Sequence, residues 1–148
     1  MCIRDRTGSL PAPPDFSKLN HASFQNNNLS GTLDQFLAPL SKLRVLNVSN
    51  NNIEGPIPDS LTANTSLASL SLQDNRLSGT LPANIGSLVE CATFRVDGNQ
   101  LSGEVPVSIQ SLPGPIVLLR GQSGCLTADS ATAAFIDGFD QFWDNGCN

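Results

Sequence analysis

An asparagine recurs every 24 residues through most of this chain, at Asn27, Asn51, Asn75 and Asn99. Apolar residues keep the same frame, two and six positions after each asparagine and three and five positions before it, and a glycine lies four positions after it. The apolar positions are Leu29, Ile53, Leu77 and Leu101; Leu33, Ile57, Leu81 and Val105; Phe24, Val48, Leu72 and Val96; and Ala22, Leu46, Leu70 and Phe94. This period predicts stacked coils, because one coil cannot cover its own apolar interior.

Each repeat carries its own signals for local structure. The segment ahead of the asparagine alternates apolar and polar residues with period two, which predicts a short, half-buried strand. The asparagine amide can satisfy backbone groups that would otherwise be buried without partners. The glycine permits a backbone conformation that a side chain would block. Three prolines favour an extended return segment, and a last apolar residue points back inward: Pro58, Pro82 and Pro106, then Leu37, Leu61, Ile85 and Ile109.

These residues resemble the plant-type leucine-rich repeat, whose pattern is LxxLxLxxNxLxGxIPxxLxxL. The third coil reads LASLSLQDNRLSGTLPANIGSL from Leu67 to Leu88, and the resemblance covers roughly residues 7 to 119. It implies an α/β repeat solenoid, a right-handed superhelix with a parallel sheet of short strands on its concave side. Members of the family include receptor-like ectodomains and polygalacturonase-inhibitor-like proteins, and most of them bind proteins, peptides or glycans.

The frame divides the chain into three parts. Residues 1–6 look like a translated sequencing adaptor, so we expect them to be a non-native leader. Residues 7–122 hold the repeats: a partial repeat at 7–18, four 24-residue coils at about 19–114 and a last strand within 115–122. The partial repeat reads like the second half of an earlier coil, which predicts that the chain is a fragment of a longer protein. Residues 123–148 form the C-terminal part.

The C-terminal part departs from the repeat and predicts a helical cap. In the 24-residue frame Pro115 and Arg120 stand where apolar residues belong, and Ser123 stands where an asparagine is due. Residues 128–143 have helical spacing of aromatic residues that would cover the last coil, with Thr127 as the expected N-cap. Cys125 and Cys147 flank this helix, and we expect them to form a disulfide in an oxidising compartment.

The outward residues of the strands are the candidate ligand-binding residues, because the resemblance implies binding on the concave face. In the 24-residue frame they form three columns, the first two continuing to Val117 and Leu119: His21 and Thr93; Ser23, Asn47, Ser71 and Arg95; Gln25, Ser49, Gln73 and Asp97. Arg95 beside Asp97 is the best local candidate. The alternative is that these polar side chains are only the solvated face of a sheet.

Other notable residues have plainer explanations. The four ladder asparagines are predicted to be structural. Cys91 takes a leucine-type position, which favours a small buried hydrophobe over a reactive thiol. Asp137, Asp140 and Asp144 share one side of the C-terminal helix, which favours a solvated acidic face over a cation site, and Arg120 is a possible partner for one of them.

Three sequons carry Asn28, Asn47 and Asn64 as candidate glycosylation sites. Asn64 is expected on the convex side and is the favoured acceptor, because a sugar on Asn47 would obstruct the concave face. Together with the expected disulfide, the sequons favour a secreted protein or the extracellular side of the cell surface.

Composition excludes several classes of function. The hydrophobic content of 39% excludes a disordered chain, and the net charge of −5 without any Lys/Arg cluster argues against nucleic acid. No apolar run approaches the ~20 residues of a membrane span. The single histidine, His21, has no orienting group, and no metal-spaced cluster or cofactor motif occurs, so neither an enzyme nor a bound metal or cofactor is expected.

The function predicted from the sequence is therefore ligand recognition by a fragment of a receptor-like ectodomain, with a protein, peptide or glycan as partner. The alternative is a self-contained secreted repeat protein, either an inhibitor of cell-wall-degrading enzymes or an ice-binding protein. Ice binding requires a regular array of exposed residues, and the residues that follow the ladder asparagines are irregular: Asn28, Asn52, Arg76 and Gln100.

Overall fold

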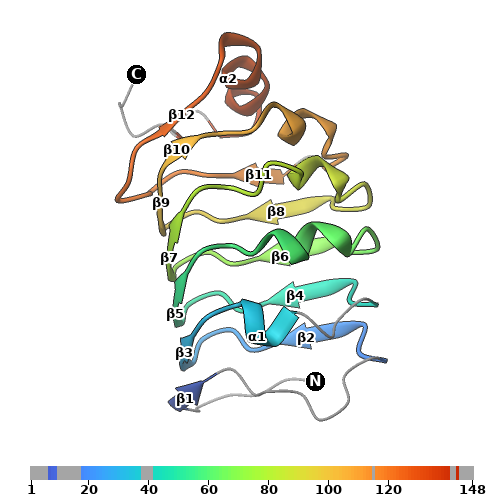
Figure 1. Ribbon diagram of the computed structural model, residues 1–148, viewed down its shortest axis with the longest axis vertical. Helices are drawn as coiled ribbons and strands as arrows, with labels where there is room; N and C mark the ends of the chain where they lie inside the picture. Colours follow the sequence, from blue (N-terminus) through green and yellow to red (C-terminus); the bar gives the residue numbers. More distant parts are fainter. Residues whose placement is uncertain (1–6, 10–17, 38–41, 115, 141–142, 144–148) are drawn as a thin grey trace.

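The computed structural model describes residues 7–9, 18–37, 42–114, 116–140 and 143. The coils stack along one axis, from β1 at one end of the molecule to α2 at the other (Figure 1). The expected leader at residues 1–6 and most of the expected partial repeat lie outside the described residues. No helix among the described residues combines the length and the apolar character needed to cross a membrane.

One five-stranded sheet is formed by the strands that precede each turn. It is parallel throughout, with the order β11-β8-β6-β4-β2. Its strands are β2 (His21–Ser23), β4 (Val45–Asn47), β6 (Ser69–Ser71), β8 (Thr93–Arg95) and β11 (Ile116–Leu118). The solenoid and the parallel sheet of short strands are confirmed.

A second five-stranded sheet follows the turns, and the sequence analysis did not predict it. It has the order β1-β3-β5-β7-β9 (Figure 1). Its strands are β1 (Thr7–Ser9), β3 (Asn28–Gly31), β5 (Asn52–Gly55), β7 (Arg76–Gly79) and β9 (Gln100–Leu101). A separate pair joins β10 (Gly103–Glu104) to β12 (Leu126–Thr127). The backbone turns between the sheets through residues with positive φ, at Asn26, Asn50, Asp74, Gly98 and Gly121.

Short helices occupy the return side of each coil. They are α1 (Asp34–Leu37), η1 (Asp59–Ala63), η2 (Ile85–Ser87) and η3 (Val107–Ser111), where η marks a 3-10 helix. Pro58 and Pro106 stand in extended backbone directly before η1 and η3. The first coil has Asp34 at the corresponding position, and there the chain forms an α-helical turn instead.

The apolar positions of the repeat form one continuous core. All twenty residues that the periodicity places inside are buried, among them the five of the third coil: Leu70, Leu72, Leu77, Leu81 and Ile85. Each coil therefore contributes the same five inward positions, and its neighbours cover them. Stacking is the source of stability in such a solenoid, because each coil alone would leave this apolar surface in water.

The ladder asparagines connect neighbouring coils. In the third coil the Asn75 amide donates to the carbonyls of Val48 at 3.0 Å and Leu72 at 3.1 Å, and Asn75 Oδ1 accepts the N–H of Ile53 at 3.0 Å. Asn51 and Asn99 repeat these contacts one coil earlier and later. A single buried side chain thus satisfies backbone groups of two coils, and the structural interpretation of the ladder agrees with this geometry.

The last coil is one residue shorter than the others, so the 24-residue frame is wrong there. β11 pairs with β8 at a spacing of 23, and Val117 lies opposite Phe94. Val117 and Leu119 are therefore buried and do not belong to the outward columns. The ladder continues at Gln122, 23 residues after Asn99, and Ser123 is not the equivalent position.

Gln122 performs the function of the missing asparagine with a longer side chain. Its amide donates to the carbonyls of Val96 at 2.8 Å and Leu119 at 2.7 Å, and its Oε1 accepts the N–H of Leu101 at 3.1 Å. Gly121 before it has a positive φ, as Gly98 does before Asn99. The same frame places Arg120, which the sequence analysis read as a misplaced apolar position, in the outward column after Asp97.

A helical cap closes the C-terminal end of the solenoid, but its bounds differ from the prediction. The helix α2 spans Ser130–Asp137, and Asp129 is its N-cap, with Oδ1 accepting from the N–H groups of Ala131 and Thr132. Thr127 was the wrong assignment, because it belongs to strand β12. The hydrogen bonds of Asp129 to the first turn also lower the pKa of its carboxyl group.

Asp140 links the cap to the last coil. Its Oδ2 accepts the backbone N–H groups of Leu119 at 2.7 Å and Arg120 at 2.8 Å. In the preceding coils the N–H equivalent to that of Leu119 donates to a carbonyl of the next coil, as Val96 does to Leu118. Asp140 is 2% exposed, so the prediction of a solvated acidic face is wrong for this residue. Asp137 accepts from the indole N–H of Trp143, and Asp144 lies outside the described residues.

Candidate functional site

The candidate site is the outward side of the sheet formed by β2, β4, β6, β8 and β11, which we call the strand face. It carries three columns of side chains: the first and last residues of each strand, and the residue two positions beyond the strand. The register aligns Asn47, Ser71 and Arg95 in the middle column. The structure therefore brings the sequence-predicted candidates together on one surface, across adjacent strands.

The exposure of the candidates is uneven. His21 is exposed, whereas Gln25, Asn47, Ser71, Thr93 and Arg95 are half-buried. Four others are buried: Ser23, Ser49, Gln73 and Asp97. The third column is thus largely sheltered from solvent, and the prediction of a merely solvated face does not describe it. The contacts of these buried side chains decide what they can do.

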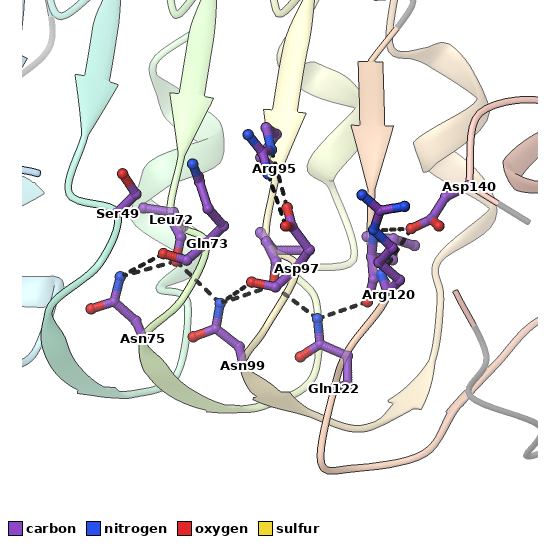
Figure 2. Close-up of polar contacts among 12 residues, drawn as sticks. Ser49, Leu72, Gln73, Asn75, Arg95, Asp97, Asn99, Arg120, Gln122 and Asp140 are labelled. Atoms are coloured by element: carbon purple, nitrogen blue, oxygen red, sulfur yellow. Dashed lines mark hydrogen bonds and ion pairs between the residues drawn. The ribbon is translucent and has the colours of Figure 1, made fainter. Parts of the chain in front are cut away.

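Arg95 and Asp97 form a bidentate ion pair on the strand face (Figure 2). Arg95 Nε donates to Asp97 Oδ1 at 3.2 Å, and Nη2 donates to Oδ2 at 2.9 Å. The arginine side chain is 33% exposed and the aspartate side chain 12% exposed. The buried carboxylate therefore holds the guanidinium in one orientation, with part of it open to solvent.

Ser49 and Gln73 occupy the same column as Asp97 on the neighbouring coils. Ser49 Oγ donates to Asn47 Oδ1 at 2.7 Å, and the Ser49 N–H donates to the same oxygen at 3.1 Å. Gln73 lies between Ser49 and the Arg95–Asp97 pair (Figure 2), and its buried Oε1 has no hydrogen-bond partner in the described part of the chain. The repeat pattern does not distinguish one polar residue of this column from another, so the sequence did not predict an unbonded oxygen at Gln73.

The three sequons differ in their geometry. Asn28 is exposed, and its Oδ1 accepts from the Asn52 amide. In the Asn47 sequon the serine is Ser49, which is buried. Asn64 Nδ2, the atom to which a glycan would be attached, donates to the Leu43 carbonyl at 3.0 Å. A glycan on Asn64 would have to displace this hydrogen bond, and the preference for Asn64 as the acceptor stays a prediction.

The two cysteines among the described residues have different states. Cys125 is disulfide-bonded, and its expected partner Cys147 lies outside the described residues, so the pairing remains a prediction. Cys91 is a free, buried thiol whose Sγ donates to the Thr93 carbonyl at 3.2 Å. Burial raises the pKa of the Cys91 thiol from 9.0 to about 11. Cys91 is therefore a packing residue, as its leucine-type position suggested.

The folded chain is expected to protect Cys91 from alkylation. A pKa of about 11 leaves about a hundredfold less thiolate near neutral pH than an unperturbed thiol, and the buried sulfur is also inaccessible. After a short treatment of the folded chain with iodoacetamide at about pH 8, mass spectrometry of the tryptic peptide 77–95 should show less than about a tenth of Cys91 modified. The same treatment in urea should modify it fully, and rapid modification of the folded chain would contradict the burial.

A protein-family comparison matches two segments of the repeats. The model described as Leucine Rich Repeat matches residues 42–64 and 66–88. Comparison with curated proteins returned no match.

Several solved structures resemble the whole solenoid. The crystal structure of PEPR1-AtPEP1 superposes with a TM-score of 0.74 at 32% identity, covering 85% of this chain and 18% of that chain. The Arabidopsis receptor kinase HAESA, in complex with the peptide hormone IDA and the co-receptor SERK1, has a TM-score of 0.78 at 28% identity, covering 95% of this chain and 24% of that chain. A plant ice-binding protein has a TM-score of 0.74 at 25% identity, covering 85% and 42%. The chain therefore spans less than a quarter of the two receptor chains.

Proposed function

The chain belongs to the plant-type leucine-rich repeat family, and from that premise we propose that its strand face binds a peptide or an extended segment of a protein, in an extracellular, receptor-like setting. The function proposed is recognition, not catalysis. Among the similar solved structures are the receptor kinase HAESA in complex with the peptide hormone IDA, and the plant peptide hormone receptor RGFR1 in complex with RGF2. The Cys125 disulfide supports an oxidising compartment.

The observation that carries this proposal is the fixed row of polar side chains on the strand face. Asn47, Ser71 and Thr93 are short and half-buried, so they leave the backbone of the sheet close to the surface. The Arg95–Asp97 pair adds an oriented charged group beside them. A surface of this kind suits an extended ligand, because the ordered side chains lose little further conformational entropy when the ligand binds.

Peptide selection with a blocking substitution tests this proposal. Random dodecapeptides displayed on phage are selected against the full chain, and the dissociation constants of the selected peptides are measured for two variants. Ser71→Trp places a bulky ring in the middle column of the strand face, and it should weaken binding by about tenfold or more. Ser78→Trp on β7 is the matched control, since it places the same ring on the other sheet, and it should leave affinity within about twofold.

Two outcomes would contradict recognition by the strand face. Selection that yields no specific peptide would remove the support for a peptide ligand. Selected peptides whose affinity is unchanged by Ser71→Trp, or equally weakened by Ser78→Trp, would show that they bind elsewhere. For the comparison of variants, circular dichroism of each one establishes that the substitution has left the fold intact.

Ice binding is the second candidate, because the plant ice-binding protein shares this fold over 42% of its own length. In the second sheet, the first residues of β3 and β5 are two asparagines that are hydrogen-bonded to each other: Asn52 Nδ2 donates to Asn28 Oδ1. The equivalent residues of the next two coils are Arg76 and Gln100, so the row of asparagines does not continue. A measurement of thermal hysteresis separates the candidates: a hysteresis gap that Asn52→Trp abolishes would support ice binding, and no gap would argue against it.

A further inference from the structure

Gln73 is the one strand-face residue whose buried polar atom lacks a partner among the described residues. Gln73 is 9% exposed, and its Oε1 accepts no hydrogen bond from the part of the chain that the structure describes. A buried amide oxygen without a donor lowers the stability of the folded state, because it has lost its bonds to water. Such a group in a native structure calls for an explanation, and a ligand donor is one that can be tested.

The residues on both sides of Gln73 direct hydrogen bonds to other groups. The hydroxyl and N–H of Ser49 on one side both donate to Asn47 Oδ1. On the other side, Arg95 Nε and Nη2 both donate to Asp97. The donor groups of Ser49 and Arg95 that make these hydrogen bonds are therefore not available to Gln73, which lies between the two residues in Figure 2.

Arg95 offers hydrogen-bond donors to a ligand, whereas Gln73 offers an acceptor. A guanidinium has five N–H donors, and the contacts with Asp97 use two of its three nitrogens. Its side chain is 33% exposed, so part of it is accessible to a ligand on the strand face. Gln73 lies two positions beyond β6, and Arg95 is the last residue of the adjacent strand β8; both side chains extend away from the ladder (Figure 2).

We propose that Gln73 and Arg95 form a subsite for an amide group of the ligand. The ligand N–H donates to Gln73 Oε1, and the ligand carbonyl oxygen accepts from the Arg95 guanidinium. This inference rests on the proposed function, which it sharpens from a peptide surface to a specific recognition group.

The charges around the subsite favour an amide over charged groups. A ligand carboxylate would satisfy Arg95 only, and it would bring negative charge toward the Asp97 carboxylate and leave Gln73 Oε1 without a donor. A ligand ammonium would supply a donor to Gln73 but would face the positive Arg95. A neutral amide carries one donor and one acceptor side by side, so it satisfies both residues without adding charge to the Arg95–Asp97 pair.

Gln73→Leu separates binding from structure. Leucine removes the unsatisfied oxygen and keeps a similar volume, so the midpoint of urea unfolding should be unchanged or higher than in the wild-type chain. The affinity for strand-face peptides should nevertheless fall about fivefold to tenfold, which corresponds to one lost hydrogen bond. Gln100→Leu, at an exposed glutamine on β9, is the matched control and should change neither property.

A scan of the peptide identifies the group that Gln73 binds. Each backbone amide of a selected peptide is replaced in turn by an ester, which removes the N–H, and each Asn or Gln side chain by alanine. One position should cost the wild-type chain about fivefold to tenfold in affinity and cost the Gln73→Leu chain almost nothing. An ester position with this coupling identifies a main-chain amide, and an Asn or Gln position identifies a side-chain amide.

The outcomes distinguish this inference from the proposed function. If Ser71→Trp abolishes binding but no peptide position couples to Gln73, the strand face binds peptides and the amide subsite is wrong. Destabilisation by Gln73→Leu would likewise overturn the inference, because it would show that the glutamine is a structural residue. If Ser71→Trp has no effect, the proposed function fails, and the subsite fails with it.

Discussion

Replacing Asn75 with leucine is expected to lower the free energy of unfolding by about 3 kcal/mol, because it leaves the buried Ile53 N–H without its acceptor, at about 1–3 kcal/mol, and removes further hydrogen bonds worth about 0.5–1.5 kcal/mol each. The substitution removes the acceptor for the Ile53 N–H and one of the two amide donors to the Val48 carbonyl, which also accepts from Asn51. It also removes one bond to the Leu72 carbonyl, which keeps its bond from the Asn99 amide. Urea unfolding followed by circular dichroism measures the change, since the coils must separate for the signal to be lost.

The control for this prediction is Asn84→Ala. Asn84 is exposed at the start of η2 and makes no capping hydrogen bond with its side chain. Its replacement should change the free energy of unfolding by less than about 0.5 kcal/mol. A loss below about 1 kcal/mol for Asn75→Leu would mean that relaxed backbone or water replaces the ladder bonds, and the structural assignment of the asparagines would then be wrong.

Replacing Asp140 with alanine is expected to cost about 3 kcal/mol, because two N–H groups at the end of the last coil lose a charged acceptor worth about 1.5–3 kcal/mol for each bond. Leu119 is fully buried, so water cannot readily replace the carboxylate at its N–H. The loss is reduced by one feature of the wild-type chain, namely that Asp140 Oδ1 is buried without a partner among the described residues. Hydrogen exchange should show faster exchange at the Leu119 and Arg120 amides, and urea unfolding gives the free energy.

Two variants make this test specific. Asp140→Asn retains a carbonyl oxygen for the N–H groups, so it should cost less than Asp140→Ala. Asp59→Ala removes an exposed aspartate from the return side and should change the stability by less than about 0.5 kcal/mol. If Asp140→Ala leaves the exchange of Leu119 unchanged, Asp140 does not cap the sheet.

The repeat was predictable from the sequence because the side chains that determine it follow a fixed period. Buried positions such as Leu70 and Leu72 alternate with outward ones, and Asn75 recurs at a constant distance from them. The pattern is set by the coil length and the backbone geometry, so it can be read without any tertiary information. The same regularity predicted the sheet, the turn and the buried state of Cys91.

The last coil shows where this reading fails. The loss of a single residue moves Val117 and Leu119 to the interior and makes Gln122 the ladder residue. A fixed 24-residue frame assigns these residues to the wrong side, because a shift of one position reverses the faces of a strand. The sequence does contain evidence for a repeat of 23 residues at this point. Gly121 precedes Gln122 as Gly98 precedes Asn99, and both glycines have a positive φ.

The sequence alone thus determined the solenoid, its core, the positions of the ladder and the strand face that carries the candidate residues. Only the tertiary structure decided how Asp140, Gln73 and Asp97 are used. Asp140 becomes a substitute for the carbonyls of a next coil because the cap places it against β11. Among the described residues Gln73 Oε1 has no donor, while Ser49 donates to Asn47 and Arg95 donates to Asp97. These contacts join residues from different coils and from the cap, and no periodicity along the chain specifies which of their atoms meet.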